Sequence, residues 1–171
     1  MPPSKQTSRK EPQAVRFQVD TALTTLAITV ERDTVTEIHL GGTASRAPET
    51  TFDRRVAGEL GEYFAGSRKE FDFPISPKGT EFQMLVWQEL QRIPYGETRT
   101  YGEIAQHLGN QRAARAVGAA NHHNPIPIVI PCHRVVATGG RLGGFGGGVE
   151  LKRRILELEA SNTTLQLCLV R

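Results

Sequence analysis

The stretch from Ile128 to Val136 constrains the fold of this 171-residue chain more than any other. It reads Ile-Val-Ile-Pro-Cys-His-Arg-Val-Val, so a thiol, an imidazole and a guanidinium lie between two apolar runs. Apolar runs of this kind are typical of buried backbone, and they draw the three polar side chains into the interior. Burying polar groups is costly unless they are paired. We therefore interpret Cys132, His133 and Arg134 as a site, with the thiol as a candidate nucleophile.

The N-terminal part is predicted to form a small sheet with one helix. Apolar and polar side chains alternate, as in half-buried strands, over Val15–Asp20, Thr24–Glu31 and Thr34–Leu40. The short turns between these segments indicate an antiparallel meander. Helical spacing of apolar residues predicts a helix over Phe52–Ala65, which ends at Gly66. A further short strand is predicted over Glu70–Phe73.

The C-terminal part is predicted to be mainly helical. Thr80 caps a helix that runs to about Ile93. Its predicted buried stripe consists of Phe82, Leu85, Val86, Leu90 and Ile93. Thr100 and Glu103 have the spacing of a capping box for a second helix over 101–108. A turn at Gly109 and a third helix over 112–120 complete a helix-turn-helix pattern, and a last helix is predicted over 149–160.

These patterns predict an α+β fold with a boundary near residue 74. We expect a disordered arm over 1–13, an N-terminal α/β domain over 14–73, a linker over 74–79 that contains two prolines, and a C-terminal domain over 80–171. The arm lacks the apolar segment of a secretory signal, so we expect a reducing, cytoplasmic setting with free thiols. The spacing of Cys and His residues does not favour a metal site, and Cys168 is interpreted as a structural thiol.

Positive charge is concentrated around the thiol. Residues 1–73 carry 10 basic and 11 acidic side chains, whereas residues 74–171 carry 11 basic and 7 acidic ones. Such a patch attracts nucleic acid, although a solvated basic surface without a partner is equally compatible with the count. In the third helix, Arg112 and Arg115 share a face with Ala119 beyond them. This pattern favours a helix that enters a DNA groove over a helix packed tightly on its neighbour.

The thiol requires an activating partner, because a free cysteine is only slightly ionised at neutral pH. In an extended segment the ring of His133 would point away from Cys132, so a turn or a bridging water is needed to couple them. A third group should orient the imidazole, and Glu159 in the last helix is the candidate. The simpler alternative, a buried structural thiol, is disfavoured by the neighbouring His and Arg side chains.

The motif Pro-Cys-His-Arg-Val, preceded by Asn-Pro-Ile-Pro-Ile-Val-Ile, resembles the active site of the O6-alkylguanine-DNA alkyltransferases. The resemblance extends over residues 80–160 and includes Arg-Ala-Ala-Arg-Ala-Val-Gly at 112–118 and the glycine-rich loop at 138–148. It implies a ribonuclease-H-like sheet in the N-terminal domain and a winged helix-turn-helix-like motif in the C-terminal domain. It also implies single-turnover repair of O6-alkylguanine in double-stranded DNA, without a cofactor, and leaves O4-alkylthymine open as a second substrate.

The resemblance implies a role for each matching residue. Cys132 would accept the alkyl group, His133 would act as base through a water molecule, Glu159 would orient His133, and Asn124 would brace the preceding turn. DNA binding and base flipping, in the minor groove, would fall to Tyr101, Arg115, Arg112, Ala113, Ala114 and Ala119. The substrate pocket would be formed by Val135, Phe145, Gly146 and Gly147, with the carbonyls of Cys132 and Val135 reading the guanine amino group. A monomer is implied, and cooperative binding to DNA is left open.

Two departures from the family pattern are visible. Phe145-Gly146 stands where the pocket loop often has Tyr-Ser or Tyr-Ala, so a phenol contact is lost and looser selectivity for alkyl size is expected. The structural zinc site of some members is not expected, because no cysteine precedes Cys132. Three other interpretations compete with this one: a lesion-binding alkyltransferase-like protein, which has Trp in place of the cysteine, a helix-turn-helix regulator, and a Cys-His hydrolase.

Overall fold

The structure, a computed structural model, describes residues 14–168, so the predicted arm over residues 1–13 lies outside the described residues. Side chains are described up to residue 163, which leaves out that of Cys168. A three-stranded antiparallel sheet with one helix is followed by a mainly helical part, as the predicted α+β class requires. No helix in the described part is long and apolar enough to cross a membrane.

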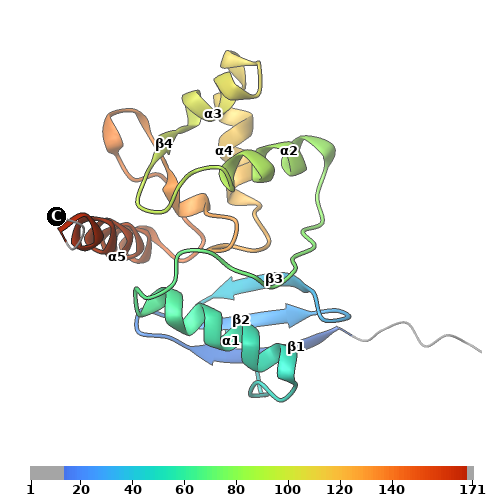
Figure 1. Cartoon of the computed structure of the whole chain (residues 1–171). Helices are drawn as coiled ribbons and strands as arrows, with labels where there is room; N and C mark the ends of the chain where they lie inside the picture. The colour runs from blue at the N-terminus through green and yellow to red at the C-terminus, as the bar shows by residue number, and fades with distance from the viewer. Residues whose placement is uncertain (1–13, 169–171) are drawn as a thin grey trace, which may run out of the picture.

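The predicted meander is confirmed. Strands β1 (Val15–Asp20), β2 (Thr25–Val30) and β3 (Val35–Leu40) pair antiparallel in the order β1-β2-β3. Helix α1 (Thr51–Phe64) packs on this sheet (Figure 1). Thr50 and Asp53 form a capping box that starts α1, and Gly66, at φ 81°, follows its end.

The strand predicted over Glu70–Phe73 is wrong. Side chains of α1 bind the backbone of this segment instead, since Glu59 accepts a hydrogen bond from the Asp72 amide at 2.7 Å and Arg55 donates one to the Asp72 carbonyl at 3.0 Å. The chain pairs with the sheet two residues later. Ile75 forms a parallel bridge to Val35, which connects the segment predicted as a linker to β3.

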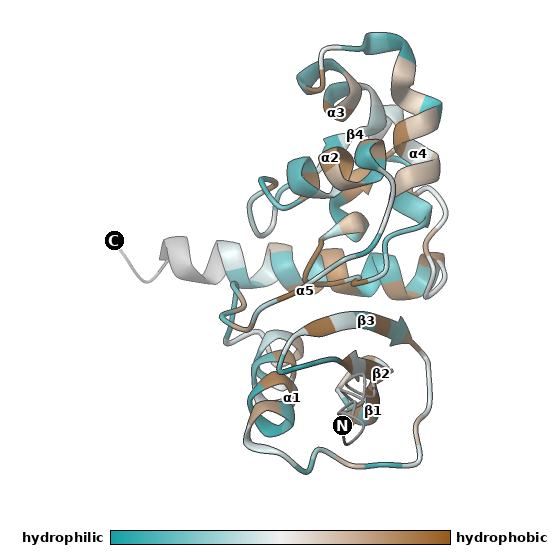
Figure 2. Ribbon diagram, turned by 90° about the vertical axis from the view of Figure 1, so that its right-hand side faces the viewer, coloured by the Kyte–Doolittle hydropathy of each residue, from teal (hydrophilic) through white to brown (hydrophobic). Residues whose placement is uncertain are grey.

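Over its described residues, the C-terminal part contains four α-helices: α2 (Glu81–Leu90), α3 (Tyr101–His107), α4 (Ala114–His122) and α5 (Val149–Cys168). Two-residue strands β4 (Arg99–Thr100) and β5 (Val135–Val136) pair in parallel. The predicted caps at Thr80 and Thr100 are both formed. Figures 1 and 2 show α5 between the sheet and the other three helices, so one helix contacts both halves of the molecule.

The buried face of α2 differs from the predicted stripe. Val86, Leu90 and Ile93 are buried as predicted, whereas Phe82 and Leu85 are 37% and 48% exposed. The reason is Trp87, whose indole Nε1 donates a hydrogen bond to the Ala120 carbonyl at 2.9 Å and turns its own side of the helix inward. Burial of this large aromatic side chain, together with its hydrogen bond, determines which face of α2 packs against the core.

This difference predicts unequal costs for two identical substitutions in α2. Leu90→Ala should lower the free energy of unfolding by about 2–5 kcal/mol, because it empties a fully buried site. Leu85→Ala, five residues earlier on the exposed side, should cost less than about 1 kcal/mol. Urea unfolding of both variants measures the difference, and equal losses would show that Leu85 is buried in solution.

Candidate active site

The backbone that carries Cys132 is held in place by two asparagines. The Asn124 side chain donates to the Ile130 carbonyl at 2.8 Å and accepts from the Ile126 amide at 3.0 Å, which closes the turn before the motif. Asn121, at the end of α4, donates to the Cys132 carbonyl at 3.4 Å. Within the turn, Ile128 has φ 77°, a strained conformation for a β-branched residue. The surrounding hydrogen bonds hold this conformation in place.

Residues Cys132–Arg134 form one turn of 3₁₀ helix rather than extended backbone. Cys132 lines a cavity of about 220 Å³, whereas His133 and Arg134 contact a buried carboxylate on α5. The other walls of the cavity come from three segments: Glu37–Leu40 of β3, the residues between Asn121 and Pro127, and the loop 144–146. The thiol therefore borders a cavity to which both halves of the molecule contribute.

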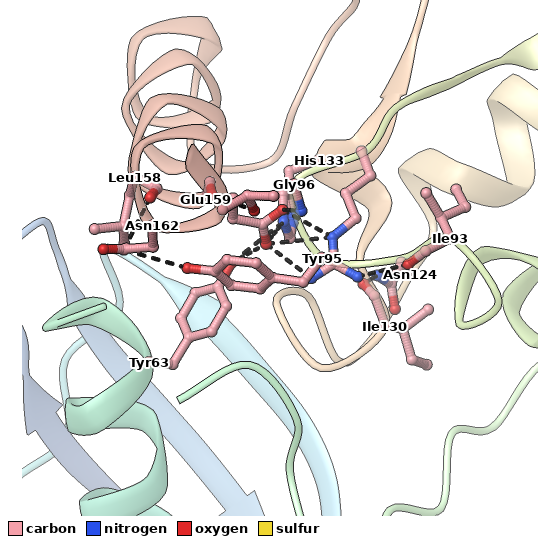
Figure 3. Close-up of polar contacts among 12 residues, drawn as sticks. Tyr63, Ile93, Tyr95, Gly96, Asn124, Ile130, His133, Leu158, Glu159 and Asn162 are labelled. Atoms are coloured by element: carbon pink, nitrogen blue, oxygen red, sulfur yellow. Dashed lines mark hydrogen bonds and ion pairs between the residues drawn. The ribbon is translucent and has the colours of Figure 1, made fainter. Parts of the chain in front are cut away.

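The carboxylate of Glu159 is the centre of the polar network (Figure 3). Its Oε1 accepts hydrogen bonds from His133 Nε2 at 3.0 Å and Arg134 Nη2 at 2.8 Å. Its Oε2 accepts from Arg134 Nε at 3.0 Å and from the Gly96 amide at 3.0 Å. Both His133 and Glu159 are fully buried. These hydrogen-bond donors offset the free-energy cost of burying the Glu159 carboxylate on α5.

The network determines which nitrogen of His133 can act as a base. Burial alone would raise the pKa of Glu159, but hydrogen bonds from His133 and Arg134 outweigh it and hold that pKa well below its usual range. Burial lowers the pKa of His133, against the opposing effect of Glu159. A neutral imidazole beside an ionised carboxylate carries its proton on Nε2. Nδ1, buried and without a partner among the described residues, is then the free acceptor.

The thiol itself is held in its neutral form. Burial raises the pKa of Cys132 to about 11, although a hydrogen bond from Asn124 and the charge of Lys152 oppose this shift. Lys152 is fully buried on α5, and its Nζ donates to the Val135 carbonyl at 2.6 Å. A thiol with this pKa needs a base at the moment of reaction, and an imidazole next to it in sequence supplies one.

The residues predicted to contact DNA lie on the helix-turn-helix with unequal exposure. Arg112, Arg115 and Ala119 are exposed, and Tyr101 is half-buried at the start of α3. Ala113 is buried and Ala114 packs against the core, so the exposed small residue beside Ala119 is Ala116 instead. The reason is a short 3₁₀ turn over Gln111–Ala113, which directs the first alanine inward before α4 begins.

Two of the four predicted pocket residues line the cavity, and the other two do not. Phe145 and Gly146 line the cavity, and the Phe145 ring lies edge-on to the His133 ring with centroids 6.4 Å apart. Val135 is fully buried, and its carbonyl already accepts the Lys152 hydrogen bond. Gly147 packs against Leu40 and Leu151, where a methyl group would collide with them. The structure therefore does not bring Val135 and Gly147 to the cavity wall.

Several residues at the site were not foreseen from the sequence. Tyr63 of α1 donates its hydroxyl hydrogen to Glu159 Oε1 at 2.5 Å, yet its spacing in the sequence is that of a core residue. Lys152 belongs to no motif, and Asn121 was not among the predicted site residues. The sequence held one signal for Lys152, namely its spacing from Glu159. The two residues are seven positions apart, which places them on one face of the last helix. No group of three candidate metal ligands occurs among the described residues.

Known proteins of one family resemble this chain over most of its length. The family described as "6-O-methylguanine DNA methyltransferase, DNA binding domain" matches residues 81–161. The methylated-DNA–protein-cysteine methyltransferase of Methanosarcina acetivorans is 54% identical over 110 residues, which is 64% of this chain and 70% of that protein. The protein of the same name from Mycolicibacterium paratuberculosis is 52% identical over 128 residues, which is 73% of this chain and 78% of that protein.

A solved structure extends the match to the N-terminal half. The crystal structure of the Mycobacterium tuberculosis OGT in complex with DNA has a TM-score of 0.79 at 43% identity, and the match covers 86% of this chain and 93% of that one. The chain therefore belongs to the methylated-DNA–protein-cysteine methyltransferase family. This confirms the family indicated by the Pro-Cys-His-Arg motif.

Proposed function

We propose that this chain repairs DNA directly, by moving the alkyl group from O6 of guanine to Sγ of Cys132. The observation that supports this most strongly is the position of Cys132. The thiol lies in a cavity of the size of a small ligand, and the adjacent His133 is bound to a buried carboxylate. A family whose curated members are named methylated-DNA–protein-cysteine methyltransferases gives this thiol its substrate.

In the proposed reaction, the thiol proton of Cys132 passes to Nδ1 of His133, directly or through a water molecule. The thiolate attacks the alkyl carbon, so the S–C bond forms while the C–O6 bond breaks and its electron pair stays on the guanine. The guanine takes up a proton as its ordinary form is restored, and His133 returns to neutrality. Holding thiolate and alkyl carbon in line supplies much of the rate acceleration. The thioether is stable, so each molecule reacts once.

The substrate must leave the duplex before it can reach this thiol. Rotating a base out of the stack costs roughly a few kcal/mol. We assign this step to α3 and α4: α4 enters the minor groove, Arg115 fills the space left by the base, and Tyr101 crowds the phosphate and donates a hydrogen bond to the guanine. Arg115 and Ala119, exposed on α4, and Arg112, exposed on the 3₁₀ turn before it, support this assignment. The protein is proposed to act as a monomer, in the compartment that holds the DNA.

Stoichiometry tests the proposal. Limiting protein is incubated with excess duplex that carries one O6-methylguanine, and the lesions lost are counted. We expect one lesion removed for each protein molecule, and none by Cys132→Ser. Continued removal beyond one equivalent would show a turning-over enzyme, and no removal by the natural chain would leave a binding protein.

A further inference from the structure

The N-terminal unit, residues 14–73, contributes the side chain of Tyr63 to the buried network around Glu159. This residue lies near the end of α1, has no exposed surface, and is 70 positions away from His133 in the sequence. Its hydroxyl lies 2.5 Å from Glu159 Oε1 and 3.3 Å from His133 Nε2 (Figure 3). We propose that Tyr63 is a positioning residue for alkyl transfer, which holds Glu159 and through it His133. The inference rests on the proposed function of Cys132.

The hydrogen-bond directions favour this role over simple packing. A phenol hydroxyl has one hydrogen, and the shorter of its two contacts identifies the carboxylate as its acceptor. Glu159 Oε1 then has three donors, namely Tyr63, His133 and Arg134. Fixing the carboxylate in this way fixes the proton of His133 on Nε2 and leaves the buried Nδ1 as the free acceptor.

The placement also explains how the sheet domain is coupled to the chemistry. α1 packs on β1, and β3 contacts the active-site turn through a hydrogen bond from the Ile38 amide to the Pro125 carbonyl at 2.8 Å. Tyr63 provides the second connection, at the opposite end of the network from Asn124. The N-terminal unit therefore holds both the turn before Cys132 and the carboxylate behind His133.

Removing the Tyr63 hydroxyl should strengthen the hydrogen bond from His133 Nε2 to Glu159 Oε1. With one donor fewer, Oε1 attracts Nε2–H more strongly, so the imidazole keeps its second proton to higher pH, and the carboxylate that orients the ring is held less firmly. The longer contact between Tyr63 and Nε2 acts in the opposite direction but is weaker. The other ionisable groups that face this pair, Cys132, Arg134 and Lys152 together with the Tyr95 ring, stay unchanged.

The test compares Tyr63→Phe with Tyr95→Phe. Tyr95 is a fair control because its ring packs edge-on against Tyr63, whereas its hydroxyl accepts a hydrogen bond from Asn162 at 3.5 Å rather than donating one to Glu159. A hydrogen bond to a charged group is worth about one to two powers of ten in an equilibrium constant, so we expect Tyr63→Phe to be roughly tenfold slower near pH 7. The acid limb of its pH–rate profile should move to higher pH, with Tyr95→Phe like the natural chain.

A second readout does not depend on activity. Nitrogen NMR of the His133 imidazole should show its titration moved to higher pH in Tyr63→Phe, and moved to lower pH when 3-fluorotyrosine, a stronger donor, replaces Tyr63. The fluorinated chain keeps the fold if the Phe variant does not. An unchanged His133 titration, or a rate loss equal at every pH, would overturn the positioning role. Failure of the natural chain to remove lesions would instead refute the proposed function, and the NMR comparison would still decide on Tyr63.

Discussion

Replacing Glu159 by Gln is expected to lower the free energy of unfolding by about 3–5 kcal/mol, because it leaves the buried guanidinium of Arg134 without its counter-charge. The same change should slow alkyl transfer at neutral pH and shift the titration of the Cys132 thiol upward, because His133 loses the carboxylate that stabilises its protonated form. Denaturant unfolding measures the first effect and single-turnover repair the second. Glu157→Gln, two residues earlier on the exposed side of α5, should change stability by less than about 0.5 kcal/mol.

The pH dependence of stability provides a separate check on Glu159. Its pKa is lower in the folded protein than in the unfolded chain, so the unfolded chain binds more protons in acid. The stability that Glu159 contributes is therefore complete above the ordinary carboxyl pKa of about 4.3 and is lost as the pH falls through the lower, folded value. Between these two values, Glu159→Gln should lose less stability than the natural chain. A parallel acid loss in both proteins would place the carboxylate outside this network.

Replacing Arg115 by Ala is expected to slow repair of O6-methylguanine in duplex DNA by roughly ten- to a hundredfold, because the flipped-out base loses the side chain that fills its place in the stack. Reaction with free O6-benzylguanine, which needs no flipping, should be nearly unchanged. Arg115 is exposed on α4 and is not among the residues that bind Glu159, so the substitution should not disturb Cys132. Single-turnover rates on the two substrates give the ratio.

Arg54→Ala is the matched control for Arg115→Ala. Arg54 is an exposed arginine on α1, in the N-terminal unit, and its loss removes the same charge from a surface without a proposed DNA contact. It should lower the duplex rate by much less. Equal losses from both substitutions would indicate a general electrostatic effect, and equal losses on duplex and free base would remove Arg115 from the flipping step.

Local sequence patterns predicted most of the secondary structure of this chain. Alternation placed β1 without error, and capping residues placed the starts of α2 and α3, because these signals depend on side chains adjacent to the backbone they cap or pair. The family motif led to the Cys132, His133 and Glu159 cluster. The packed face of α2 could not be predicted, because it depends on the bond of Trp87 to Ala120, 33 positions away.

The contribution of the N-terminal unit to the site could not be predicted from the sequence either. Tyr63 has the spacing of a core residue on α1, and nothing in its neighbours indicates a polar partner on α5, 96 positions later. Tyr63 meets its acceptor because α5, which carries Glu159, lies between the two halves of the molecule. Long-range polar pairs of this kind have no local pattern, which is why no site residue was predicted within residues 14–73.

Alkyl transfer to Cys132 is tested most directly by the mass of the peptide that contains this residue, after incubation with duplex DNA bearing O6-methylguanine. We expect a gain of one CH2 group on this peptide, located at Cys132 by fragmentation and absent with unmodified duplex. Loss of the methyl group from DNA without this mass change, or the same change on another residue, would contradict the role of Cys132 as the acceptor.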